Sequence, residues 1–175
     1  ISLRQINKLA IPAIIAGISE PILSLTDAAI VGHMSVHATE SLAAVGVVTA
    51  FLSMLIWVLG QSRSAISSIV SQYVGANKIN EVKDLPIQAI AIILLISAVV
   101  CVITYPFSRS IFSLYNASGL LLDYSVSYYK IRVIGLPFTL YVFAVFGVFR
   151  GLQNTYYPMI IAITGATVNI LLDFI

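Results

Sequence analysis

The sequence predicts an all-α fold, a polytopic membrane helical bundle, and three observations support that prediction. The 175 residues are 59% hydrophobic and only 9% charged, whereas soluble domains carry roughly a quarter charged residues. The mean hydropathy is +1.02. The apolar residues gather in five long stretches separated by short polar connections. A water-soluble globular fold is therefore excluded.

Each apolar stretch is long enough to cross a bilayer, because a hydrocarbon core of about 30 Å needs about 20 residues of helix. The predicted spans cover residues 9–31, 42–74, 85–105, 120–149 and 156–175. The second stretch would be about 50 Å long as one helix, and its second half is rich in serine. That half either lines a water-filled cavity or extends into the cytoplasm, or it packs closely against another helix.

The first stretch is too long for a cleaved signal peptide and contains two carboxylates and two prolines. Basic residues gather at the N-terminus and in the even-numbered connections, at Arg4, Lys8, Lys78, Lys83 and Arg150. Cytoplasmic loops carry the excess of Lys and Arg. We therefore expect a multi-pass protein of the cytoplasmic (inner) membrane with its N-terminus in the cytoplasm.

Several function classes find no support in the composition. The single cysteine, Cys101, excludes a disulfide scaffold, and a net charge of +2 is no nucleic-acid footprint. No P-loop, GxSxG or HExxH motif is present. His33 and His37 have no third metal ligand nearby, so a solvated loop is expected there. We expect no enzyme and no cofactor. The chain begins at Ile1 and ends in an apolar run, which is typical of a piece of a longer membrane protein.

Three carboxylates occur inside the predicted spans, at Glu20, Asp27 and Asp173. A charged carboxylate at the centre of a membrane helix costs roughly 2.5–3.5 kcal/mol, so each is a candidate functional residue. Asp27 follows Pro12 by fifteen residues, and Asp173 follows Pro158 by the same interval. Each carboxylate would lie about 22 Å along its helix from that proline. The two are therefore expected at one depth in the membrane.

Helical periodicity places further polar groups beside these carboxylates. Asn169 precedes Asp173 by four residues and Glu20 precedes Asp27 by seven, so each pair shares a helix face. Such a cluster can hold a hard cation such as sodium through oxygen ligands. It can also bind a proton, because like charges in a low-dielectric site favour protonation of one of them. The alternative is that Asp27 and Asp173 are each satisfied separately, by Ser24, Thr26, Asn169 or the backbone.

Pro12 and Pro21 interrupt the hydrogen bonds of the first span and permit it to bend. Arg63 and Arg132 either reach the membrane interface with their charged ends or form ion pairs in the interior. The segment from Gly147 to Gly151 matches GxxxG, a weak signal for close helix packing.

Several short motifs follow one another along nearly the whole chain. They are Leu9-Ala-Ile-Pro12, Glu20-Pro-Ile-Leu-Ser-Leu-Thr-Asp-Ala-Ala-Ile-Val-Gly-His33, Leu42-Ala-Ala-Val-Gly46, Val70-Ser-Gln-Tyr-Val-Gly-Ala76, Tyr129-Lys-Ile-Arg132, Gly135-Leu-Pro137, Phe149-Arg-Gly-Leu-Gln-Asn-Thr155 and Asn169-Ile-Leu-Leu-Asp173. Together they resemble the multidrug and toxic compound extrusion (MATE) family. The residues around Asp27 resemble its DNA-damage-inducible, DinF-like branch.

The resemblance implies five transmembrane helices of the N-terminal lobe of a twelve-helix antiporter. Such a protein exports small organic, often cationic, compounds, including drugs, in exchange for protons or sodium. The resemblance assigns the cation or proton site to Asp27, Asn169 and Asp173, which would be the ligands of a sodium ion. It also associates the proline at position 12 with helix bending. Asn154 and Tyr157 stand where many relatives have an Asp and a basic residue, which weakens any charge pairing there.

The leading hypothesis is a cation-coupled multidrug efflux antiporter, with proton coupling alone or in competition with sodium. We expect a small organic substrate, contact with membrane lipid, no nucleic-acid partner and a monomer. The main alternative is a lipid-linked precursor flippase of the same superfamily, which would have a cavity rich in Arg and Lys. The spans hold at most Arg63, Lys130 and Arg132, which argues against it. A membrane enzyme or a purely structural subunit is a third possibility.

Overall fold

The computed structural model describes residues 2–32 and 37–173, except for the side chains of Gln5, Glu20, Asp27 and Asp173. Within these ranges the regular elements are all helical, which confirms the predicted all-α bundle. They are α1 (Leu3–Gly32), α2 (Ala38–Gly60), α3 (Ser62–Gly75), η1 (Ile79–Glu81), α4 (Leu85–Thr104), α5 (Ser108–Leu114), α6 (Gly119–Arg132), η2 (Val133–Gly135), α7 (Leu136–Gly151) and α8 (Tyr156–Asp173).

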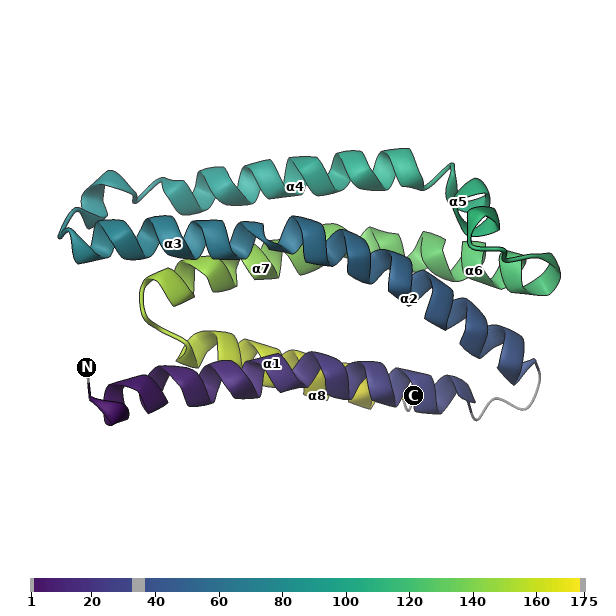
Figure 1. The fold of residues 1–175 in the computed structure, drawn as a ribbon, viewed down its shortest axis with the longest axis horizontal. Coiled ribbons are helices and arrows are strands. Elements are labelled where there is room, and N and C mark those ends of the chain that lie inside the picture. Colours follow the sequence, from purple (N-terminus) through teal and green to yellow (C-terminus); the bar gives the residue numbers. More distant parts are fainter. Residues whose placement is uncertain (1, 33–36, 174–175) are drawn as a thin grey trace.

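The helices form two layers (Figure 1). Helices α1 and α8 lie side by side in one layer, and α2, α3, α4, α6 and α7 form the other. The hydroxyl of Thr155, just before α8, donates a 3.0 Å hydrogen bond to the carbonyl of Leu9 in α1. The two helices therefore run in the same direction from a common level.

Within the described residues, four helical runs are long and apolar enough to cross a membrane. They are Ile6–Gly32, Ala38–Gly75, Ile79–Thr104 and Gly119–Gly151. The apolar helix Tyr156–Leu172 is shorter within the part of the chain that the structure describes.

Two of these runs are interrupted, although an unbroken helix over 42–74 was expected. At the first break, α2 ends at Gly60 and α3 begins at Ser62. Ser62 donates from its hydroxyl to the carbonyl of Leu59 at 2.7 Å, and Gln61 donates from its amide to that of Trp57 at 3.1 Å. Side-chain donors here compete with the backbone ladder. At the second break, α6 passes through η2 into α7.

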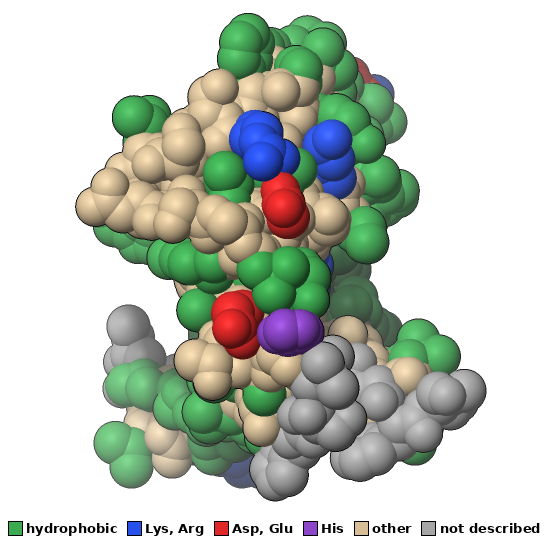
Figure 2. Space-filling view, turned by 90° about the vertical axis from the view of Figure 1, so that its right-hand side faces the viewer, with side chains coloured by type: hydrophobic (Ala, Val, Ile, Leu, Met, Phe, Trp, Pro, Cys, Tyr) green, Lys and Arg blue, Asp and Glu red, His purple; other side chains and the backbone are tan. Residues whose placement is uncertain are grey.

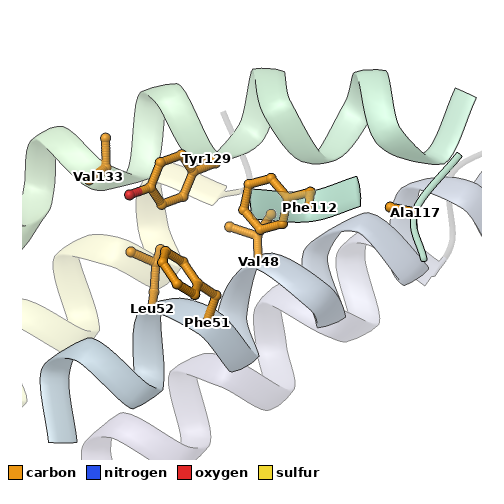
Figure 3. Packing of buried hydrophobic residues seen from close by; sticks show 7 residues of the cluster. All are labelled: Val48, Phe51, Leu52, Phe112, Ala117, Tyr129 and Val133. Carbon is orange, nitrogen blue, oxygen red and sulfur yellow. The ribbon is translucent and has the colours of Figure 1, made fainter. Parts of the chain in front are cut away.

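A buried aromatic cluster joins α2, α5 and α6 (Figure 3). Phe51, Phe112 and Tyr129 meet edge to face, with ring centroids 5.3–5.9 Å apart. This geometry is favoured by the quadrupoles of the rings. Val48, Leu52, Ala117 and Val133 complete the cluster. The cluster fixes the end of the bundle at which α2 begins.

Helices α3 and α7 approach closely at two glycines. A Cβ atom at Gly147 would lie 2.7 Å from the carbonyl oxygen of Arg63, and one at Gly151 would lie 2.6 Å from Cβ of Val70. Only hydrogen fits at these positions, which confirms the packing role of the GxxxG match. Apolar side chains of α3, α4 and α7 fill the rest of this contact.

Charged side chains occur in pairs at the end of the bundle that Figure 2 shows. Arg109 binds Asp123 at 2.9 Å, and His37 lies 3.9 Å from Glu40. His33 lies outside the described residues. Among the described side chains no group of three metal-binding residues occurs.

Candidate functional site

A cavity of about 480 Å³ lies between the two layers. Helices α1 and α8 form one wall, and α2, α3, α6 and α7 contribute the other. Among the described side chains, its polar lining consists of hydroxyls, one amide and three guanidinium groups, from Ser19, Ser24, Thr49, Ser53, Thr139, Asn169, Arg63, Arg132 and Arg150. The outward faces of the same helices carry many exposed large apolar side chains. The polar cavity is therefore the candidate site for binding a solute inside the membrane.

The cavity is elongated along the helices. Its lining residues on α7 extend from Thr139 to Arg150, about 16 Å of helix. A short loop joins α7 to α8, and the two helices run in opposite directions (Figure 1). Ile161 of α8 therefore lies towards the Arg150 end, and Asn169 lies towards the Thr139 end.

Of the predicted site residues, Asn169 lines the cavity. The side chains of Glu20, Asp27 and Asp173 lie outside the described residues, and only their places on α1 and α8 are given. Asp27 follows the lining residue Ser24 by three positions, and Asp173 follows Asn169 by four. This spacing puts both positions on the lining faces, one turn beyond Ser24 and Asn169. A shared cation or proton site stays a prediction.

Helix α1 continues through both Pro12 and Pro21. Proline has no N–H, so Pro21 leaves the carbonyl of Gly17 without its usual helical donor. Gly17 is among the lining residues of the cavity. Bending at the two prolines stays a prediction.

Each of the three arginines has a distinct local setting. Arg63 is in the first turn of α3, where its guanidinium lies 4.7 Å from the centroid of the Phe143 ring. This cation–π contact offsets the unfavourable end of the helix dipole. Arg132 ends α6, where the dipole favours a cation, and it lies 5.9 Å from the ring of Tyr128.

Arg150 lies at the end of α7, half-buried, and interacts electrostatically with Arg63. The two guanidinium groups therefore repel one another. No ion pair joins any of the three cavity arginines to a carboxylate whose side chain the structure describes. Arg63 and Arg132 both line the cavity, and the two interpretations given for them, an interfacial position or an interior ion pair, stay predictions.

Arg150 and the ring of Phe143 are site residues that the sequence did not predict. Arg150 was placed in the connection before the fifth span, and Phe143 lies in an unbroken apolar run. The three arginines are separated by 69 and 18 positions along the chain. No periodicity within one helix brings them together. Arg63 and Arg132 share one signal, since each lies beside a helix break, whereas Arg150 lies near the end of α7.

The sequence of the chain matches that of a known protein family. The model of the MatE family matches residues 12–175. The chain belongs to the MatE family. Members of this family are transporters, and the resemblance to the family seen in the sequence is confirmed.

Two relatives of the MatE chain match almost all of it. DNA damage-inducible protein F of Escherichia coli (strain K12) is 27% identical over 166 residues, 94% of this chain and 36% of the relative. Multidrug resistance protein MdtK of Yersinia enterocolitica is 27% identical over 172 residues, 98% of this chain and 37% of the relative. The chain thus spans little more than a third of the length of these relatives.

Solved structures share the fold of the MatE chain. A MOP superfamily transporter from Pyrococcus furiosus gives a TM-score of 0.85 at 22% identity. A MATE protein in complex with MaD3S gives 0.84, also at 22% identity. Each match covers 97% of this chain and 37% of the other. At this level of identity the likeness concerns the fold.

Proposed function

We propose that the chain forms part of a secondary active transporter that exports organic compounds across the cytoplasmic membrane by antiport with protons or sodium. One observation carries the proposal, namely the polar cavity between the two helix layers of a MatE-family bundle. Its volume suits a drug-sized solute. The flippase alternative is less favoured, since the matched relatives include a multidrug resistance protein.

The proposed coupling site consists of Asp27, Asn169 and Asp173, with Glu20 on the same face of α1. Carboxylate and amide oxygens suit a sodium ion, and clustered carboxylates suit a proton. Binding of either ion changes the charge of the site by one. Bending of α1 at Pro12 and Pro21 would connect this change to the shape of the cavity wall.

Transport in vesicles that contain the full-length protein tests this proposal. We expect efflux of an organic dye to follow an imposed pH gradient in nominally sodium-free buffer. Asp27→Asn should abolish that efflux while insertion and expression persist, because Asn keeps the shape of the side chain but cannot titrate. Asp123→Asn is the matched control, since Asp123 is an exposed carboxylate paired with Arg109.

Two outcomes would contradict parts of this proposal. Coupled efflux at the wild-type rate in Asp27→Asn would remove Asp27 from the mechanism. Efflux that responds to an imposed sodium gradient at equal pH, with no response to a pH gradient, would exclude proton coupling and leave the oxygen atoms as sodium ligands.

A further inference from the structure

We infer that Arg63 and Arg150 form an anion-binding subsite in the cavity. The compound that this site takes is a water-soluble organic anion with an aromatic or apolar body and a carboxylate, sulfonate or phosphate group. The inference rests on the proposed transport function and names the substrate class of the same cavity.

Two positive charges meet at this end of the cavity. Arg63 and Arg150 interact as like charges at one cavity. The ion pairs among the described side chains lie elsewhere, at His37–Glu40, Lys78–Glu81 and Arg109–Asp123. Repulsion between two guanidinium groups grows as the effective dielectric constant falls. An anion placed between them adds two attractions that offset this repulsion.

The subsite lies at the far end of the cavity from the predicted coupling site. The Arg150 end of the cavity is the end of Ile161 on α8. Asp173 lies twelve residues further along α8, about 18 Å away. Asp27 is expected at the same level as Asp173. Along α1, the acidic position nearest to the subsite is Glu20. Its single carboxylate compares with three guanidinium groups at the cavity.

Aromatic rings line the cavity beside the two arginines. The ring of Phe143 lies against the Arg63 guanidinium, and Phe146 lines the cavity one turn before Arg150. Flat apolar surface therefore adjoins the two charges. A guanidinium binds carboxylate, sulfonate or phosphate oxygens through a planar fork of N–H donors. Together these groups favour an aromatic anion over an organic cation.

The test measures binding by the purified full-length protein in nanodiscs of zwitterionic lipid, with no ion gradient. The probes are pyrene-1-sulfonate and 1-pyrenemethylammonium, which share one ring system and differ in charge. We expect the sulfonate to bind at least about tenfold more tightly, which one charge-assisted hydrogen bond would account for. Added salt should weaken sulfonate binding.

Arg150→Gln should weaken sulfonate binding about tenfold or more and leave binding of the cation unchanged or stronger. Arg150→Lys keeps the charge and should retain most of the affinity, which separates loss of charge from loss of fold. Arg109→Gln is the matched control, because Arg109 is exposed and lies outside the cavity. Its affinity for the sulfonate should equal that of the wild type.

Tighter binding of the cation, or equal sulfonate binding in Arg150→Gln and the wild type, would overturn the inference. A further arm repeats the titration in nanodiscs that contain phosphatidylglycerol. Retained sulfonate binding supports a soluble anion, and its loss would assign the subsite to a lipid phosphate and overturn the soluble-anion inference. Binding needs no gradient, so failed ion coupling with intact sulfonate binding would refute the proposed antiport and leave this subsite standing.

Discussion

Tyr129 is fully buried, and its hydroxyl donates a 2.6 Å hydrogen bond to the hydroxyl of Thr104. Thr104 in turn donates to the carbonyl of Val100 at 2.7 Å. The chain of two bonds joins α6 to α4 next to the aromatic cluster. Each hydroxyl acts as donor, and the Thr104 oxygen also acts as acceptor, which polarises and strengthens both bonds.

Tyr129→Phe should lower the stability of the protein by about 1 kcal/mol, because it removes one hydrogen bond and keeps the ring in the cluster. Thermal unfolding in detergent measures the loss. Tyr141→Phe is the control, since Tyr141 is exposed. Equal effects of the two substitutions would show that the bond to Thr104 contributes nothing.

At the scale of the elements, the apolar stretches of the sequence predicted where the helices occur. In lipid, a helix is the structure that satisfies the hydrogen bonds of the backbone within one segment. The breaks were harder to predict. Glycine and serine are common inside membrane helices, so Gly60 and Ser62 do not by themselves predict a break. The observed bonds to the carbonyls of Leu59 and Trp57 show where the helical hydrogen bonds are interrupted. Of the candidate site, Asn169 was identified because it lies four residues before Asp173 on the same helix face. Arg150 was not, because its neighbours come from other helices.

Gly151→Ala should destabilise the α3–α7 contact by about 1–3 kcal/mol, as overpacking does, because the new methyl group would meet Val70. Gly46→Ala in α2 is the matched control, with no atom within 4 Å of its Cβ position. That substitution should be neutral or slightly stabilising. Melting temperatures of both variants provide the comparison, and a loss of equal size in both would contradict close packing at Gly151.

For the whole molecule, the basic residues predict which end of the bundle meets the cytoplasm. The N-terminus and the α3–α4 connection lie at one end, and α5 lies at the other (Figure 1). Lys78 and Lys83 are exposed in that connection. The excess of Lys and Arg favours the cytoplasm for this end.

Single cysteines introduced in a Cys101→Ala background test the orientation. Lys83→Cys should react with a membrane-impermeant maleimide only from the cytoplasmic side. Leu114→Cys, at an exposed position in α5, should react from the opposite side. The reverse pattern of labelling would place the N-terminus outside the cytoplasm.

Helices α1 and α8, which pair in the folded bundle, are synthesised at different times. Leu9 and Thr155, which join the two helices, are separated by 146 positions. At about 5–20 residues per second on the ribosome, α1 waits roughly 7–30 s for its neighbour. During that interval Glu20 and Asp27 enter the bilayer before the helix that carries Asn169 and Asp173 has been made. A chain cut after Gly151 should therefore leave α1 without its partner and be degraded faster than the complete chain, which a pulse–chase experiment would measure.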